Sequence, residues 1–253
     1  MIRKAFLSLA VLFLCILTLP GWGQDVASLL RQGEALEKKF KDDEALEKYL
    51  EATKKDPSNI AAICKVSELY SVIGKRKETK EEQREYYKTG NQYARLALKA
   101  APANSEANFA MAISMGRTAQ VSSGQEKIKA VRGIKTYADR CVQYDPGNYK
   151  GYYLIGRWNF DVSDLNSLER WLVKITVGAL PPSSLEAAIK NYQKSMQLNP
   201  SFILNYYELA RAYKRKDELA MAKKLLEQMQ TLPPAFTDDL KIKVLGRKML
   251  DEL

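Results

Sequence analysis

A short proline-containing phrase recurs along this chain of 253 residues and separates segments with helical patterns. Its four copies, which begin at residues 56, 101, 145 and 199, read Asp-Pro-Ser-Asn, Ala-Pro-Ala-Asn, Asp-Pro-Gly-Asn and Asn-Pro-Ser-Phe. A fifth variant, Leu-Pro-Pro, begins at residue 232. Proline cannot continue a helix, but it suits the first turn of the next one. The phrase therefore predicts a series of helices joined by short turns.

The spacing of these prolines identifies the kind of repeat. Residues 57, 102, 146, 200 and 234 lie 45, 44, 54 and 34 residues apart, and a period of 34 with two helices per unit is the tetratricopeptide (TPR) signature. Small or aromatic residues fall 12, 8 and 5 positions before the proline, most clearly as Ala45, Tyr49 and Ala52, Ala188, Tyr192 and Ser195, and Ala222, Leu226 and Met229. Small residues in the first helices, such as Gly33 and Gly156, would let the partner helix approach closely. The sequence thus predicts an all-α, right-handed α-solenoid of about five TPR-like units.

Departures from the 34-residue period are interpreted as insertions. Between residues 165 and 178, apolar side chains fall on one face of a helix, so the third unit is expected to contain one additional helix. Ser183 and Glu186 have the spacing of a capping box that would start the helix after it. The repeat domain is placed at residues 24–236. Residues 237–253 are expected to form a capping helix, which a solenoid needs to cover its last apolar face.

Residues 1–23 are expected to be an export signal. Arg3 and Lys4 precede an apolar run over residues 5–19, and Gly21 and Gly23 supply small residues after it. This pattern is typical of a signal peptide, here cleaved after Gly23, and predicts an exported protein, periplasmic or secreted. The alternative is an uncleaved membrane anchor through residues 5–19, although a helix of this length spans only about 22 Å of a hydrocarbon core about 30 Å thick.

Composition excludes several kinds of chemistry. The chain contains no histidine, which rules out Ser-His-Asp and Cys-His catalysis, and no set of zinc ligands can be assembled around its 3 cysteines. Cys64 and Cys141, 77 residues apart, are expected to be buried free thiols. No phosphate-binding or calcium-binding loop is found, so no catalytic residue, metal or cofactor is predicted. The net charge is +10, but the lysine clusters have acidic neighbours. We therefore expect no nucleic-acid partner, whereas contact with an anionic membrane surface stays open.

From about residue 63 to the end, the chain resembles the regulator of microtubule dynamics family. The resemblance is carried by Gly156-Arg157-Trp158, by the inserted helix with Trp171, and by Leu180-Pro181-Pro182-Ser183-Ser184. The segments 199–202 and 209–213 extend it. The resemblance implies an all-α TPR-like domain without catalytic residues, in a family whose members associate with microtubules or act at organelle surfaces. An exported protein would not meet tubulin, so we carry over the family's fold rather than its name.

The concave groove of a TPR array is lined by the first helix of each unit, with the fifth and ninth positions usually pointing inward. The predicted groove residues are Tyr153, Arg157, Phe160, Tyr207, Arg211 and Lys214. Arginine offers a fork of donors and tyrosine a flat wall, so such a ladder would suit a peptide segment or an anionic group. In the alternative, the arginines pair with acidic neighbours and the tyrosines only pack.

We expect a non-catalytic scaffold that binds a partner protein or peptide in this groove, since a preformed surface has little ordering cost on binding. The alternative function is a carrier for a lipid or other apolar ligand. In that case the inserted helix would close the groove, and Trp171, Leu172 and Ile175 would form an apolar wall.

Overall fold

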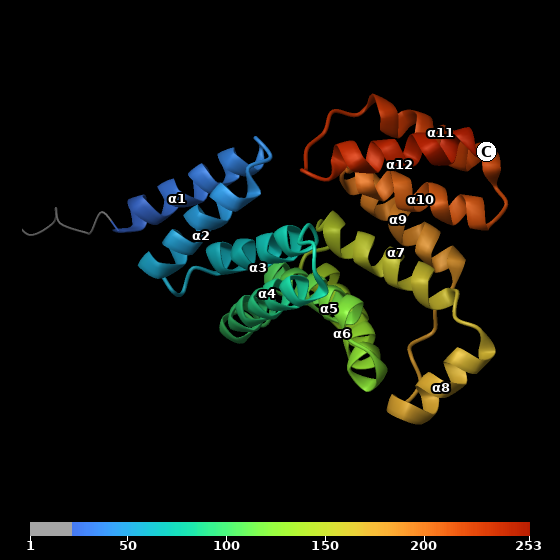
Figure 1. Cartoon of the computed structure of the whole chain (residues 1–253), viewed down its shortest axis with the longest axis horizontal. Coiled ribbons are helices and arrows are strands. Elements are labelled where there is room, and N and C mark those ends of the chain that lie inside the picture. Colours follow the sequence, from blue (N-terminus) through green and yellow to red (C-terminus); the bar gives the residue numbers. More distant parts are fainter. Residues whose placement is uncertain (1–21) are drawn as a thin grey trace, which may run out of the picture.

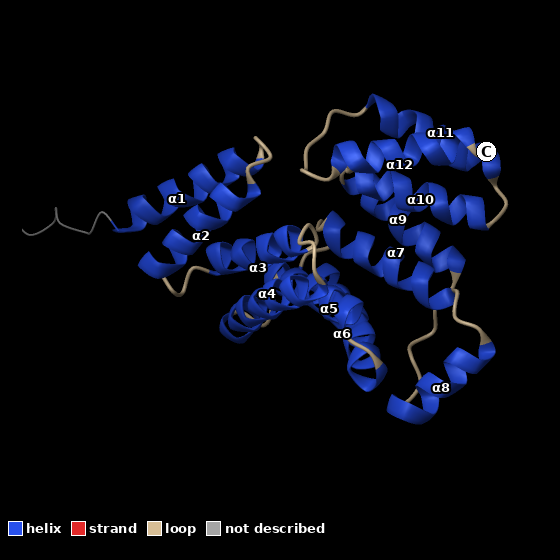
Figure 2. Cartoon of the chain, viewed as in Figure 1, coloured by secondary structure: helices blue, strands red, loops and turns tan. Residues whose placement is uncertain are grey.

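In the computed structural model, residues 22–253 are described, and they form α-helices without a β-strand (Figure 2). The helices are α1 (Trp22–Glu37), α2 (Asp42–Lys55), α3 (Ile60–Gly74), α4 (Lys80–Ala100), α5 (Ser105–Val121), α6 (Gly124–Tyr144), α7 (Tyr149–Ser163), α8 (Ser167–Val177), α9 (Leu185–Leu198), α10 (Ile203–Arg215), α11 (Leu219–Thr231) and α12 (Asp239–Asp251). The apolar run of the predicted export signal lies outside the described residues. The cleavage position proposed after Gly23 falls in the first turn of α1.

Antiparallel helix pairs follow one another around an arc (Figure 1). The pairs are α1 with α2, α3 with α4, α5 with α6, α7 with α9, and α10 with α11, and α12 packs against the last pair. Each pair buries its apolar face against the next pair, which is the arrangement of a solenoid. The predicted all-α solenoid of TPR-like units is confirmed.

The recurring proline phrase acts by capping the first helix of a unit. The side-chain oxygens of Asn59 and Asn104 accept hydrogen bonds from backbone N–H groups in the first turns of α3 and α5, at 3.0 and 2.9 Å. Asn148 does the same for α7, at 3.1 Å. Such caps satisfy backbone donors that a helix start leaves without partners. In the fourth copy Phe202 takes the place of the asparagine, and α10 begins without a side-chain cap.

The predicted repeat register matches the pattern of burial. The three residues selected before each of residues 57, 200 and 234 are completely buried: Ala45, Tyr49, Ala52, Ala188, Tyr192, Ser195, Ala222, Leu226 and Met229. Helix approach is close where a glycine faces a tyrosine. A Cβ at Gly33 would lie 2.5 Å from the Tyr49 ring, and one at Gly156 would lie 2.7 Å from the Tyr192 ring. These glycines are therefore required by packing.

The insertions have two different structural outcomes. The extra residues of the second and third pairs lengthen α4 and α6 to 21 residues each, compared with 14 in α2 and α9. The additional helix expected near 165–178 is α8, which packs against α6 and projects away from the arc (Figure 1). It lies between α7 and α9, within the fourth pair rather than the third unit that the sequence suggested. The capping box expected at Ser183 and Glu186 is not formed. Ser184 is the N-cap of α9 and accepts from the backbone N–H of Ala187 at 3.0 Å.

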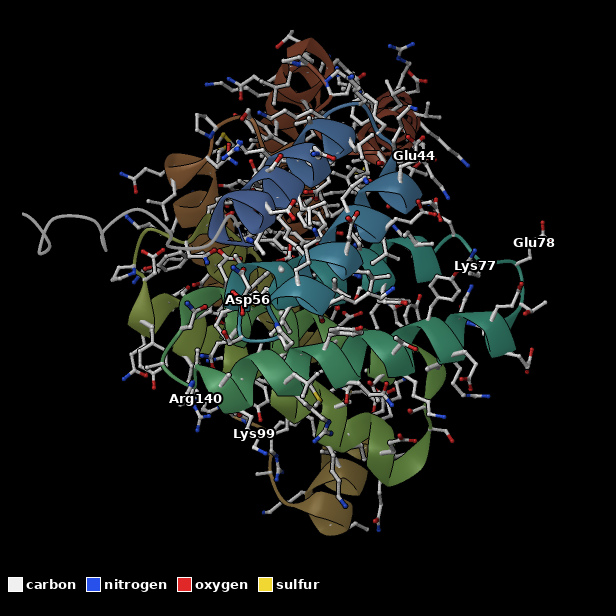
Figure 3. All side chains as sticks on the ribbon, turned by 90° about the vertical axis from the view of Figure 1, so that its left-hand side faces the viewer. Glu44, Asp56, Lys77, Glu78, Lys99 and Arg140 are labelled. Carbon is white, nitrogen blue, oxygen red and sulfur yellow. The ribbon has the colours of Figure 1, made fainter. Side chains whose placement is uncertain are left out.

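The outward surface is polar and of mixed charge. Glu44, Lys77, Glu78, Lys99 and Arg140 all project from the body on the face shown in Figure 3. Among the helices described, none is both long enough and apolar enough to cross a membrane. Over residues 22–253, no three His, Cys, Asp or Glu side chains gather as a metal site.

Candidate functional site

The two predicted groove arginines meet on one carboxylate. Arg157 of α7 and Arg211 of α10 each donate through Nη1 to Glu208 of α10, the second at 2.7 Å. The Nε of Arg157 also donates to Asp161 at 2.8 Å. Only 4% of the Glu208 side chain is exposed, whereas 38% of Arg157 and 34% of Arg211 are exposed. The arginines thus have the acidic neighbours that the alternative interpretation described, and they tie α7 to α10.

The other predicted groove residues also contact their own fold. Phe160 is buried, and the guanidinium carbons of Arg211 and Arg215 lie 4.8 and 5.1 Å from its ring centroid. Tyr207 is half-buried against the C-terminal core, and Lys214 pairs at 3.4 Å with Glu252, the residue that directly follows α12. The structure therefore brings Arg157, Phe160 and Arg211 together, while Lys214 reaches toward the end of the solenoid.

The electrostatics of this network follow from burial and from Glu208. Burial raises the pKa of Tyr153, and the negative charge of Glu208 raises it further. Burial alone would lower the pKa of Arg157, but Glu208, Tyr153 and Asp161 raise it above its ordinary value. Both side chains therefore keep their protons, and the network is a fixed set of donors and charges rather than an acid–base centre.

A second chain of charges crosses from α1 to α7. Lys65 of α3 donates to both carboxylate oxygens of Glu37 of α1, at 3.1 and 2.9 Å, and Tyr49 donates to Glu37 at 2.6 Å. Lys150 of α7 pairs with Glu106 of α5 and lies 3.8 Å from Glu68 of α3. Burial raises the pKa of Glu68, while Lys150 and Lys65 oppose that rise. These pairs fix consecutive first helices to one another.

A cavity of about 540 Å³, the central cavity, lies on the concave side between these helices and α12. Its apolar lining consists of Leu69, Val72, Phe202, Leu204, Ala235, Phe236 and Ile242. The other lining residues are polar or charged: Glu34, Glu37, Lys38, Asp42, Lys65, Lys75, Arg117, Thr237, Asp238 and Asp239. Because residues from both ends of the chain line it, the cavity depends on the curvature of the whole solenoid.

An aromatic cluster forms one wall of the central cavity. The ring centroid of Phe202 lies 5.2 Å from those of Tyr149 and Tyr153 and 6.0 Å from that of Phe236, in edge-to-face arrangements. Such geometries stabilise aromatic pairs beyond the area they bury. Phe236 remains 48% exposed. The contacts of Phe202 therefore fix the position of this wall, and the exposed ring of Phe236 is accessible to a ligand.

The two ends of the solenoid meet across the cavity through residues 232–238, the crossing segment between α11 and α12. Thr237 Oγ1 donates to Asp42 Oδ2 at 2.7 Å, and Arg76 Nη1 donates to the same oxygen at 2.6 Å. Lys75 pairs with Asp238 at 2.7 Å. The crossing segment therefore links the last helix to α2 and α3, and Figure 1 shows it reaching toward the loop between α1 and α2.

The predicted apolar wall on the inserted helix is placed elsewhere. Ile175 is 59% exposed and is not among the residues that line the central cavity. The side chains of Trp171 and Leu172 lie outside those that the structure describes. Arg132 of α6 anchors the end of α8 by donating to the carbonyl oxygens of Gly178 and Ala179, at 2.8 and 3.1 Å. The described part of α8 thus packs on the α6 side.

Sequence reasoning missed three charged residues that organise the concave side. Glu208 follows Tyr207 directly in the sequence. A carboxylate this close to two arginines that were expected to face the groove could have indicated an ion pair. Lys150 stands at the start of α7, where no position of the repeat pattern selects it. Arg117 lies near the C-terminal end of α5, beyond the fifth and ninth positions used for the prediction.

Similar solved structures are TPR proteins or share their helical-repeat architecture. The TPR protein TTC0263 of Thermus thermophilus matches with a TM-score of 0.65 and 14% identity, over 89% of this chain and 98% of that chain. PilF of Pseudomonas aeruginosa matches with a TM-score of 0.55 and 12% identity, over 92% of this chain and 87% of that chain. At these identities the likeness supports the fold.

Curated relatives are regulators of microtubule dynamics. Regulator of microtubule dynamics protein 3 of Rattus norvegicus is 26% identical, and the match covers 69% of this chain and 37% of the relative. The same protein of Mus musculus is 25% identical, and the match covers 85% of this chain and 47% of the relative. Protein 2 of Bos taurus is 27% identical over 63% and 39%. The matched region is thus less than half of each relative. The family profile "Regulator of microtubule dynamics protein 1-3" matches residues 29–253, which extends the resemblance about one repeat toward the N-terminus. The chain therefore belongs to the regulator of microtubule dynamics family.

Proposed function

We propose that this protein is a non-catalytic scaffold that holds a short segment of a partner protein in the central cavity. The observation that carries the proposal is the cavity itself. Its volume of about 540 Å³ falls in the usual range for ligand sites, and first helices from both ends of the solenoid build it. A site assembled by the fold before binding has little ordering cost. The Arg157–Glu208–Arg211 network supports this by fixing α7 to α10 beside the cavity.

The chemistry of the lining favours a peptide over a purely apolar ligand. Nine of the seventeen lining residues carry a charge, and the apolar ones gather mainly around the aromatic wall. A peptide offers hydrogen-bonding groups to the charged lining residues and a side chain to the aromatic wall. An acyl chain would cover the charged groups and exclude water from them without offering hydrogen bonds. The lipid-carrier alternative is therefore the second candidate. Native mass spectrometry of the purified protein would support the carrier if a lipid remained bound.

Photo-crosslinking from the cavity tests the proposal. Benzoylphenylalanine placed at Phe236, an exposed aromatic position of the lining, should give a discrete crosslinked partner in the native compartment. The same amino acid at Tyr144 is the matched control, because Tyr144 is similarly exposed, at 44% against 48%, and lies outside the lining. The partner segment would then be identified by mass spectrometry.

Binding of the identified segment gives the quantitative test. Phe236→Ala should weaken it about tenfold or more, since buried aromatic anchors dominate such interfaces, and Tyr144→Ala should leave it unchanged. Both side chains are exposed, so neither variant should lose its fold. Equal crosslinking from both positions, or wild-type affinity in Phe236→Ala, would place the partner outside the cavity.

We also propose that residues 1–23 direct export, so that the partner would be met outside the cytoplasm and would not be tubulin. The basis is the basic start followed by the apolar run over residues 5–19. Mass analysis of the mature protein is the test. A mature chain that begins at Gln24 supports cleavage, and an intact N-terminus in the membrane fraction supports the anchor.

A further inference from the structure

One half-buried cation on the wall of the central cavity lacks a counter-ion. Arg117 of α5 lines the cavity, and its Nε is buried without a hydrogen-bond partner. Its Nη1 makes one long contact, 3.4 Å from Gln120 Oε1, and its guanidinium carbon lies 5.9 Å from the ring centroid of Tyr87. Among residues 22–253, no carboxylate forms an ion pair with it. Arg117 is thus a half-buried guanidinium with unused donor capacity.

Two neighbouring cations of the lining form ion pairs with carboxylates, whereas Arg117 does not. Lys65 pairs with Glu37, and Lys75 pairs with Asp238. The carboxylate of Asp42 is taken by Arg76 and Thr237. Glu34 and Lys38 remain at the exposed rim. The cavity therefore holds internal ion pairs, an exposed lysine at its rim, and one half-buried guanidinium that no carboxylate of the described residues pairs with.

The surroundings of Arg117 work against its charge. Burial lowers its pKa, Tyr87, Tyr153 and Asp238 oppose that fall, and the like charge of Arg157 adds to it. A guanidinium still keeps its proton in proteins, so the cost of desolvation persists until an anion offsets it. A bound anion would use the free donors and remove this cost.

We propose that Arg117 is the anion-recognition residue of the central cavity and that its ligand is a carboxylate on the partner segment. The same segment would place an aromatic or aliphatic side chain against Phe202 and Phe236. This inference rests on the proposed function and adds the chemistry of the segment.

The five carboxylates of the lining decide between classes of anion. Glu34, Glu37, Asp42, Asp238 and Asp239 outnumber the four cations of the lining by one, so the lining has a formal net charge of −1. With Arg117 counted in that net charge, a doubly charged phosphate meets about twice the net repulsion of a singly charged carboxylate. The planar fork of arginine can pair with two oxygens of either anion, so the charge of the ligand makes the difference. The cavity therefore selects a carboxylate over a phosphate.

The test uses small probes and arginine Nε–H resonances in the full chain. N-acetylphenylalanine carries a carboxylate and a ring, N-acetylphenylalaninamide carries the ring alone, and inorganic phosphate carries only the anion. We expect N-acetylphenylalanine to shift the Arg117 resonance saturably, with at least tenfold tighter binding than either other probe. Arg117→Gln should abolish that preference over the amide. Arg140→Gln is the matched control, since Arg140 lies on the outer face (Figure 3), and it should keep the preference.

Arg117→Gln should fold, because it removes an unpaired charge from a half-buried position, and its amide spectrum checks this. If acid and amide bind the cavity equally in both wild type and Arg117→Gln, Arg117 reads no anion, and the inference is overturned while the proposed function stands. Tighter binding of phosphate would overturn the carboxylate assignment. If no probe shifts a cavity resonance, the inference is also overturned, and photo-crosslinking from Phe236 then decides the proposed function by itself.

Discussion

Glu208 is the residue on which the charged network between α7 and α10 depends. Glu208→Gln keeps the shape of the side chain but removes the charge that faces Arg157 and Arg211. It loses two charge-assisted hydrogen bonds, each worth about 1.5–3 kcal/mol when buried. The two guanidiniums are each about a third exposed, so water would recover a large part of that loss. We expect the free energy of unfolding to fall by about 2 kcal/mol.

Thermal and urea denaturation followed by circular dichroism measure this effect. A loss of about 2 kcal/mol corresponds to a decrease in Tm of roughly 4–8 °C for a chain of this size. Glu252→Gln is the control, because the Glu252 side chain is 52% exposed and its pair with Lys214 is 3.4 Å long. That variant should stay within about 0.5 kcal/mol of wild type. If Glu208→Gln behaves like the control, the network does not hold α7 to α10.

Three further predictions concern packing and protonation. Gly156→Ala should cost about 1 kcal/mol in urea denaturation, because the new Cβ lies 2.7 Å from the buried Tyr192 ring and the overlap outweighs the gain in helix propensity; a more stable variant would refute the close approach. Tyr192→Phe should be as stable as wild type or up to about 1 kcal/mol more stable, since the Tyr192 hydroxyl is buried without a partner, and a clear loss would reveal a hydrogen bond there. Burial raises the pKa of Cys64 to about 12 and that of Cys141 to about 11. At pH 8 both should therefore react with iodoacetamide at least about a hundredfold more slowly in the folded chain than in denaturant. Because the folded state holds these protons more tightly, this stabilising contribution is present below the ordinary thiol pKa of 9.0 and is lost as the pH rises from there toward about 12. Equal labelling of folded and unfolded protein would contradict the burial.

The architecture could be predicted from the sequence because successive units bury residues at equivalent positions. The selected positions recur most clearly before residues 57, 200 and 234, and there they are completely buried, as Ala45 and Tyr192 are. Helix ends depend on local hydrogen bonds and were predicted less well. Ser183 and Ser184 are adjacent hydroxyls before one helix, and only the three-dimensional turn decides that Ser184 caps it.

The concave site could not be predicted in the same way, because it joins residues that are distant along the chain. Asp42 and Thr237 are 195 positions apart and meet only because the solenoid curves far enough for its ends to touch. Curvature is the sum of small rotations between successive pairs, and no local pattern records that sum. The fifth and ninth positions of α7 and α10 lie on neighbouring helices, but Glu208 pairs with both Arg157 and Arg211 and makes them an ion-paired link rather than free donors.

Phe202 interrupts the recurring phrase at the position where the other copies have a capping asparagine, and this departure bears on function. Three copies of the phrase place an asparagine before the first helix, where it caps that helix, and a cap of this kind is worth about 1 kcal/mol. The fourth copy gives up the cap at α10 and places an aromatic ring at the same point. That ring contacts Tyr149, Tyr153 and Phe236 and lines the central cavity. Departures from a locally favourable pattern are expected at functional or strained sites. The position of this departure, on the wall of the cavity that Arg117 also lines, therefore supports the central cavity as the functional face of the solenoid independently of the charge argument.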